Sequence, residues 1–201
     1  MLEESLVYVG TVTFAVTGAL VAVQKRFDLV GVLVLAAVTA IGGGSIRDLV
    51  AGIIPPASLT NEPLLWLVFA TGLLVFALHR FVPEGRTLYV FDTVSLGLFA
   101  ALGAQRGIEV GFGLWGTVFA GAVSGTGGGI IRDVLSGEVP GVLYRSGDFY
   151  ASAAAIGAAA TYLLHGLSPS GAVIAGAALT ILLRVGSRLA GLELPVPRTP
   201  T

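Results

Sequence analysis

The segment Gly42-Gly-Gly-Ser-Ile-Arg-Asp-Leu-Val-Ala-Gly-Ile-Ile-Pro55 decides the fold of this chain, because it occurs twice. Its second copy is Gly127-Gly-Gly-Ile-Ile-Arg-Asp-Val-Leu-Ser-Gly-Glu-Val-Pro140, and eight of the fourteen positions are identical at an offset of 85 residues. The chain therefore contains one unit twice. The same offset relates pairs far outside the motif: Phe14 and Phe99, Gly18 and Gly103, Gly31 and Gly116, Thr39 and Ser124, Gly72 and Gly157.

The residues around the motif have the composition of a membrane protein. Of 201 residues, 55% are hydrophobic and only 11% are charged, with a mean hydropathy of +0.90. Soluble domains carry about 25% charged residues. The formal net charge of −1 gives no basic field, so no nucleic-acid partner is expected. The absence of cysteine excludes disulfides, Cys-ligated metal centres and thiol catalysis.

Seven apolar stretches approach the length of about 20 residues that a bilayer-spanning helix needs. We expect an all-α integral membrane protein with one transmembrane domain over residues 1–190. Repeat 1 covers about 5–82 and repeat 2 about 88–166, and residues 191–201 form a Pro-rich tail that we expect to be disordered in the cytoplasm. The predicted spans are 5–23, 29–52, 63–81, 88–104, 113–137, 149–165 and a seventh helix at 169–189.

The number of spans in each repeat predicts their relative orientation. Three spans are an odd number, so the second repeat enters the membrane from the opposite side. The two repeats are then related by a pseudo-two-fold axis in the membrane plane, an arrangement found in many transporters, with the functional site where the halves meet. The alternative is that the duplication only built a stable bundle.

Basic residues predict the orientation of the chain. Seven of them fall on the side of Lys25, and only Arg106 falls on the opposite side. The positive-inside rule then places the N-terminus outside and the C-terminus in the cytoplasm of a prokaryotic cell, with the protein in the plasma membrane. The seven are Lys25, Arg26, Arg80, Arg86, Arg145, Arg188 and Arg198, and the predicted outer side carries Glu3, Glu4, Glu62 and Glu109.

The motif combines backbone freedom with charge at membrane depth. Each glycine costs about 1 kcal/mol of helix propensity relative to alanine, so we expect helices to kink or unwind near Gly42, Gly43 and Gly44 and near Gly127, Gly128 and Gly129. One turn later come Arg47-Asp48 and Arg132-Asp133, and each charge costs about 2.5–3.5 kcal/mol at a helix centre in lipid. Adjacent residues point about 100° apart, so we expect these charges to find partners on other helices or on freed carbonyls. They either form a static internal ion pair or line and gate a polar path.

Other polar residues near the motif are weaker candidates for a pore lining. Asp92 lies one turn into the fourth predicted helix, either at the interface or in a permeation path, and the equivalent position in repeat 1 is Val7. Hydroxyl side chains flank the glycines, although Ser and Thr in membrane helices also bond back to their own backbone or simply pack. These hydroxyls belong to Thr39, Ser45, Ser124 and Thr126.

An enzymatic function has no support in the sequence. Gly125-Thr-Gly-Gly-Gly129 lies in an apolar span and lacks the Lys of a nucleotide-binding loop. No Ser/His/Asp or metal-ligand constellation is present either, so neither catalysis, a cofactor nor a metal site is expected.

The duplicated Gly-Gly-Gly-x-x-Arg-Asp-x-x-x-Gly, Phe91-Asp92 leading into Gly97-Leu-Phe99, and Val139-Pro140 resemble the prokaryotic branch of the trimeric intracellular cation (TRIC) channels. This branch overlaps the UPF0126-like bacterial proteins labelled as glycine transporters, and the resemblance covers about residues 5–190. It implies seven helices in inverted repeats and a homotrimer in lipid, with one pore for potassium and also sodium in each protomer. Kinked second and fifth helices would line that pore, and these helices carry Arg47, Asp48, Arg132 and Asp133 here.

Three functions remain open at this stage. The first is a passive cation channel, which the acidic outer side favours because it concentrates cations. The second is a carrier for glycine or another small amino acid, whose carboxylate would suit the two arginines and half-helix N-termini. The third is a structural membrane protein that transports nothing.

Overall fold

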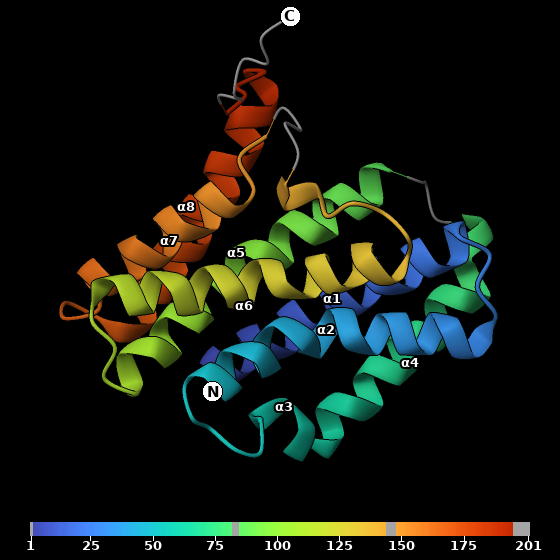
Figure 1. The fold of residues 1–201 in the computed structure, drawn as a ribbon, viewed down its shortest axis with the longest axis horizontal. Helices are drawn as coiled ribbons and strands as arrows, with labels where there is room; N and C mark the ends of the chain where they lie inside the picture. Colours follow the sequence, from blue (N-terminus) through green and yellow to red (C-terminus); the bar gives the residue numbers. More distant parts are fainter. Residues whose placement is uncertain (1, 82–84, 144–147, 195–201) are drawn as a thin grey trace, which may run out of the picture.

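The computed structural model describes residues 2–81, 85–143 and 148–194, and over these ranges it contains helices and loops and no β-strand (Figure 1). The expectation of an all-α chain is confirmed for the described residues. In chain order the helices are α1 (Leu2–Gln24), α2 (Leu29–Val50), the single turn α3 (Ala57–Thr60), α4 (Glu62–Leu78), α5 (Arg86–Glu109), α6 (Leu114–Leu135), α7 (Ala151–Leu164) and α8 (Pro169–Leu189), with 3₁₀ turns η1 (His79–Phe81) and η2 (Gly141–Leu143).

Short polar side chains set the start of three helices. Asp28, Asn61 and Ser168 each accept a hydrogen bond from the backbone N–H three residues later, at 2.8, 3.1 and 3.2 Å. These bonds satisfy N–H groups that have no partner inside the helix. A proline follows within the first turn of α4 and of α8, where its missing N–H costs nothing.

In the described part of the chain, six helices are long and apolar enough to cross a membrane: α1, α2, α4 continued through η1, α5, α6 and α8. They correspond to six of the seven predicted spans. The predicted span at 149–165 is shorter than expected, since α7 has 14 residues. Its rise of about 21 Å is less than the hydrocarbon thickness of about 30 Å. From residue 195 onward, the tail predicted to be disordered lies outside the described residues.

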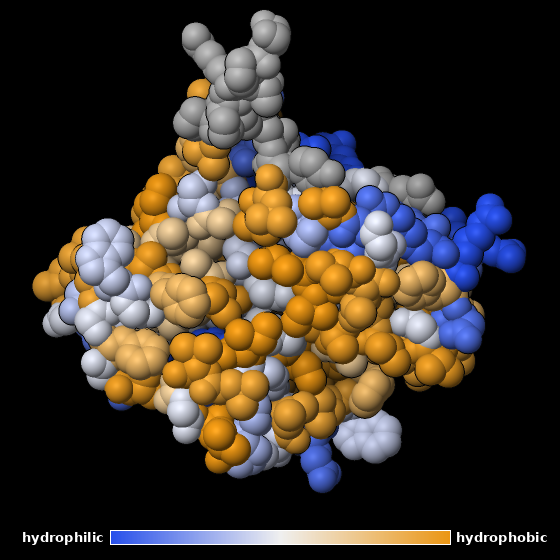
Figure 2. Space-filling view, viewed as in Figure 1, coloured by the Kyte–Doolittle hydropathy of each residue, from blue (hydrophilic) through white to orange (hydrophobic). Residues whose placement is uncertain are grey.

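The long helices pack around α1 and α5. α4 packs on α1 and α2, whereas α7 and α8 pack on α5 on the other side of the molecule (Figure 1). Phe14 and Phe99, which the offset of 85 relates, stack on each other at the centre with ring centroids 5.3 Å apart. Apolar residues cover most of the face seen in Figure 2, and hydrophilic residues gather at one edge, as expected for helices that face lipid.

The prediction that the triple glycines unwind their helices is wrong. α2 is helical without interruption through Gly42–Gly44, and α6 is helical without interruption through Gly127–Gly129. An unwound turn at membrane depth leaves backbone N–H and C=O groups without partners, which lipid does not supply. An intact helix keeps these bonds inside the segment.

The glycines instead allow α2 and α6 to touch along their backbones. A Cβ atom on Gly43 would overlap the carbonyl oxygen of Ser124, and one on Gly128 would overlap the carbonyl oxygen of Thr39. A Cβ on Gly127 would lie 2.9 Å from the Cα of Gly43. We call this contact the glycine crossing. It is reciprocal, because the offset of 85 relates Gly43 to Gly128 and Thr39 to Ser124.

Candidate functional site

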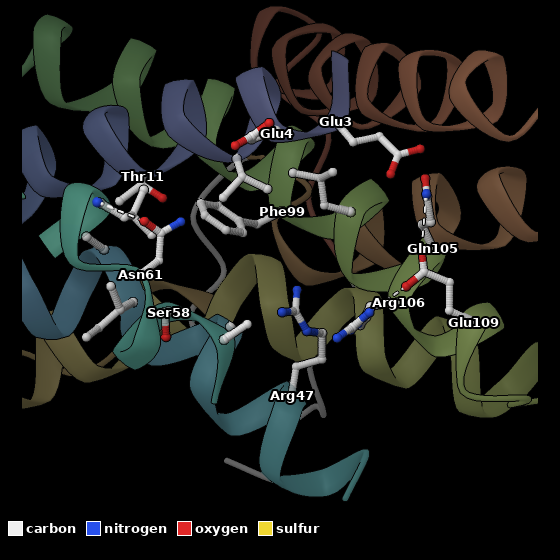
Figure 3. A pocket seen from close by; sticks show the side chains of 17 residues that line it. Glu3, Glu4, Thr11, Arg47, Ser58, Asn61, Phe99, Gln105, Arg106 and Glu109 are labelled. Atoms are coloured by element: carbon white, nitrogen blue, oxygen red, sulfur yellow. Dashed lines mark hydrogen bonds and ion pairs between the residues drawn. The ribbon is translucent and has the colours of Figure 1, made fainter. Parts of the chain in front are cut away.

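One cavity lies where α1 begins and where α2 and α5 end. Its volume is about 320 Å³. It is referred to below as the outer cavity, since its residues lie on the predicted outer side. Figure 3 shows its polar lining, which includes both acidic and basic side chains. The charged and amide residues of the lining are Glu3, Glu4, Arg47, Asn61, Gln105, Arg106 and Glu109.

Arg47 brings the first Arg-Asp motif to this cavity. Its Nε and Nη2 donate to one carboxylate oxygen of Asp48, at 3.0 and 2.7 Å. The two neighbours therefore pair with each other, because the flexible arginine side chain folds back over the aspartate. Nη1 also donates to the hydroxyl of Ser124 on α6 at 3.3 Å, so one bond of Arg47 spans the glycine crossing.

The aspartates of both motifs hold the loops that follow their helices. The second carboxylate oxygen of Asp48 accepts the backbone N–H of Ala57 at 3.0 Å. In the second copy, Asp133 accepts the backbone N–H of Gly141 at 3.1 Å. Each aspartate therefore divides its two oxygens between the adjacent arginine and the next loop, a role that the sequence did not indicate.

A second cavity of about 270 Å³, the inner cavity, lies where α5 begins and where α6 and α8 end. Asp92 lies in its lining and is 4% exposed, so its carboxylate is buried among protein side chains. One oxygen of Asp92 accepts from Arg132 at 2.8 Å and the other from Arg184 at 2.7 Å. Arg132 also pairs with its neighbour Asp133 at 2.9 Å.

The charged side chains of the inner cavity also contact two aromatic rings, those of Tyr89 and Tyr150. Arg184 pairs with Asp148 at 3.4 Å, and its guanidinium lies 4.4 Å from the ring centroid of Tyr150 and 5.1 Å from that of Tyr89. The guanidinium carbon of Arg188 lies 3.8 Å from the ring centroid of Tyr89. The cavity is thus lined by three arginines and three aspartates, which balance in charge.

The two cavities lie at opposite ends of α5. Asp92 borders the inner cavity and Gln105 borders the outer one. These residues are separated by 13 positions of a continuous helix, which is about 20 Å along its axis. The glycine crossing adjoins the outer cavity, since Ala40 and Gly44 on either side of Gly43 line it, and Arg132 of the inner cavity follows Gly128 by four residues.

The predicted hydroxyl residues take different positions. Ser124 binds Arg47, and Ser45 bonds the Ser58 hydroxyl of the outer cavity at 2.9 Å. Thr39 and Thr126 donate to the carbonyl four residues earlier in their own helices, at 2.6 and 2.8 Å, and neither lines a cavity.

The motif glycines are also divided between several environments. Gly44 lines the outer cavity. Gly43, Gly127 and Gly128 form the crossing itself, and Gly42 lies against the side chain of Ile131. Gly129 has the hydroxyl of Tyr150 beside it.

Several residues of the two cavities are absent from the sequence prediction, among them Gln105, Asp148, Tyr150 and Arg184. One signal was available, because Arg184 interrupts the apolar run from Ile181 to Val185, and a charge within a span marks a functional or paired site. The other three lie at helix ends, where polar residues are ordinary. Among the described residues, no group of three or more His, Cys, Asp or Glu side chains is arranged to hold a metal ion.

Comparison with known proteins supports the duplication. The profile of a family described as glycine transporter matches the chain twice, over residues 4–80 and 89–166, once in each repeat. The UPF0126 membrane protein of Deinococcus radiodurans is 50% identical over 195 residues, which cover 96% of this chain and 90% of that protein. The UPF0126 inner membrane protein YadS of Escherichia coli (strain K12) is 36% identical over 209 residues, which cover 97% and 96%.

Solved structures share the fold. A chain solved for the structural basis of conductance through TRIC cation channels superposes with a TM-score of 0.89 at 38% identity, over 98% of both chains. The TRIC orthologue from Rhodobacter sphaeroides superposes with a TM-score of 0.88 at 36% identity, over 94% of this chain and 98% of that one. The helical fold and the two charged cavities thus define a multi-pass membrane protein with the architecture of a TRIC channel. The chain belongs to the prokaryotic TRIC family, which overlaps the bacterial membrane proteins described as glycine transporters.

Proposed function

We propose that this protein is a passive channel for monovalent cations, potassium and also sodium. The observation that carries the proposal is the pair of charged cavities at opposite ends of α5, with the glycine crossing adjoining the outer one. The permeation path runs inside the protomer along α2 and α6, from the outer cavity past the crossing to the inner cavity. The fold shared with TRIC cation channels supports the same function.

The backbone contact at the glycine crossing corresponds to a closed state of the proposed path. α2 and α6 approach too closely for a side chain at Gly43 or Gly128, so there is no room for an ion between them. Opening therefore requires the two helices to separate or to bend at the glycines. The bond from Arg47 to Ser124 joins the two helices at this level, and it must break or follow the movement.

We also propose that the two repeats are inverted relative to each other and that the protomer has seven spans. The shortest of these spans is α7. The reciprocal contacts of the glycine crossing and the stacking of Phe14 on Phe99 support a two-fold relation between the repeats. Three protomers form a homotrimer in the plasma membrane, as the name of the TRIC family implies, with a pore in each.

Single introduced cysteines test the orientation of the chain without interference, since the sequence contains no cysteine. An impermeant thiol reagent added to intact cells should label Glu62→Cys and spare Arg86→Cys, and the opposite pattern would refute an outside N-terminus.

A recording from purified protein in planar bilayers tests the channel directly. We expect unitary currents in symmetric potassium chloride and reversal potentials in salt gradients that indicate cation over anion selectivity. Well-assembled protein that carries no unitary current, and liposomes that show no potassium flux, would refute the channel.

A carrier for glycine or a similarly small amino acid is the second candidate. The outer cavity favours it, because Arg47 can bind a carboxylate while Glu3 and Glu109 in the same lining can bind an ammonium group. The glycine-transporter family profile agrees with this chemistry. Saturable uptake of labelled glycine into liposomes, lost in Arg47→Ala and occurring without unitary currents, would select the carrier over the channel.

A further inference from the structure

Gln105 carries a buried oxygen that has nothing to bind. The side chain lines the outer cavity, yet the residue is only 6% exposed. Its amide nitrogen donates to a carboxylate oxygen of Glu109 at 3.3 Å, and this bond fixes the orientation of the amide. Oε1 then has no hydrogen-bond partner among the residues that the structure describes. Since buried acceptors in proteins are almost always satisfied, this oxygen indicates a missing partner.

An acidic side chain on the same lining also lacks a partner. Glu3 is partly buried, lines the same cavity and makes no ion pair with any described residue. The two basic residues of the cavity are already engaged: Arg106 with Glu109 at 2.7 Å, and Arg47 with Asp48. In Figure 3, Glu3, Gln105 and Glu109 follow one another along one side of the cavity. That side therefore presents acceptors without enough donors.

A cation supplies what both groups lack. Amide and carboxylate oxygens are hard ligands, which suit alkali and alkaline-earth ions. Tight divalent sites gather several carboxylates, and the described chain has no such group. By their chemistry, the amide oxygen of Gln105 and the carboxylate of Glu3 suit an ion of single charge.

We propose that Glu3 and Gln105 form a binding site for an alkali metal ion at the outer mouth of the permeation path. Glu109 positions the Gln105 amide, and the site concentrates the ion before it reaches the glycine crossing. This inference rests on the proposed channel function in one respect only, that the bound ion is also the conducted one.

Thallium(I) is the probe for the site, because it resembles potassium and scatters anomalously. Crystals of the full-length protein grown with thallium acetate should show an anomalous peak between Gln105 and Glu3. The peak should disappear in Gln105→Met and persist in the control Glu62→Gln, which removes an exposed charge from the same predicted side without touching the cavity. A peak that is absent from the wild-type protein, or an ordered water in its place, would overturn the proposal whether or not the variants fold.

Conductance provides the second measurement. At about 0.01 M salt, where screening is weak, Glu3→Gln and Gln105→Met should reduce the inward potassium current about twofold to tenfold relative to Glu62→Gln. At about 1 M salt, where the screening length falls to about 3 Å, the difference should vanish. Equal currents in all three variants at low salt would overturn the recruiting role. A thallium peak in a protein without unitary currents would keep the site and refute the channel, so the two failures are distinguishable.

Discussion

The two copies of the Arg-Asp motif are almost identical in sequence, but their surroundings differ. In both copies the arginine folds back on the next aspartate, and that aspartate also binds the following loop. Arg132 is held in addition by Asp92, which Arg184 binds from the other side. Among the described residues, Arg47 has only the hydroxyl of Ser124 as a further partner beyond Asp48, at 3.3 Å.

This difference assigns different roles to the two ends of the proposed path. The inner arginine is 8% exposed and pairs with Asp92 and Asp133, and Asp92 also pairs with Arg184, so this network links α5, α6 and α8. The outer arginine is 13% exposed to a cavity and makes one long bond to the opposite helix. We therefore expect Arg47 at the outer cavity to be able to move and Arg132 at the inner cavity to stay fixed. Three predictions test this contrast, from the largest expected effect to the smallest.

Asp92→Asn should cause the largest loss of stability. The substitution leaves Arg132 and Arg184 buried with a neutral partner, and removal of one member of a buried charge network typically costs about 3–5 kcal/mol. The midpoint of thermal unfolding in detergent should fall sharply and little trimer should be recovered. The matched change Asp48→Asn should cost less, because water in the outer cavity can solvate Arg47. If both variants melt at the same temperature, the contrast between the two ends is wrong.

Alanine at the glycine crossing should have an intermediate effect. Gly43→Ala and Gly128→Ala each place a methyl group against a carbonyl oxygen of the facing helix, and such overpacking typically costs about 1–3 kcal/mol. We expect lower thermal stability and an altered open probability in bilayers. Gly44→Ala is the control from the same motif, since the nearest atom to its Cβ would be Arg47 Nη2 at 3.8 Å. A Gly43→Ala protein that behaves as Gly44→Ala does would show that the close approach is unimportant.

Arg47→Ala should lower stability less than Asp92→Asn, because the Asp48 carboxylate left behind keeps the hydrogen bond from the Ala57 N–H, and it should clearly change the current. Its loss removes a positive charge from the outer cavity and the bond to Ser124, so single-channel conductance should rise about twofold to tenfold at low salt. Arg47→Lys keeps the charge but loses the forked geometry, and it should restore the conductance of the wild-type protein. Unchanged unitary currents in assembled Arg47→Ala protein would place this residue outside the path.

The sequence alone predicted the duplication, the helical membrane class and the Arg-Asp motifs. The helical membrane class was predictable because lipid imposes simple rules on apolar length, and the same rules make charged motif residues such as Arg132 stand out against their surroundings. Apolar length also predicted six helices that are long enough to span a membrane among the described residues. The seventh predicted span, over 149–165, corresponds to the shorter helix α7.

Predictions that depend on contacts between helices were weaker. Three glycines in a row are compatible both with a broken helix and with close packing, and only the position of α6 beside Gly43 decides for packing. The partners of Asp92 are 40 and 92 residues away in the sequence, so no local pattern connects them. Gln105 was missed for a similar reason, because its unpaired oxygen is defined by the absence of neighbours in space.

The reciprocity of the glycine crossing has a consequence for how this chain was able to evolve. A contact in which residue i meets j' and residue j meets i' is the kind that two identical subunits make about a two-fold axis. In such a dimer every substitution acts twice, so a change that suits one end of the molecule is imposed on the other. Once both copies are in one chain, each is free to change alone. Val7 and Asp92, which the offset of 85 residues relates, differ in this way between the two copies.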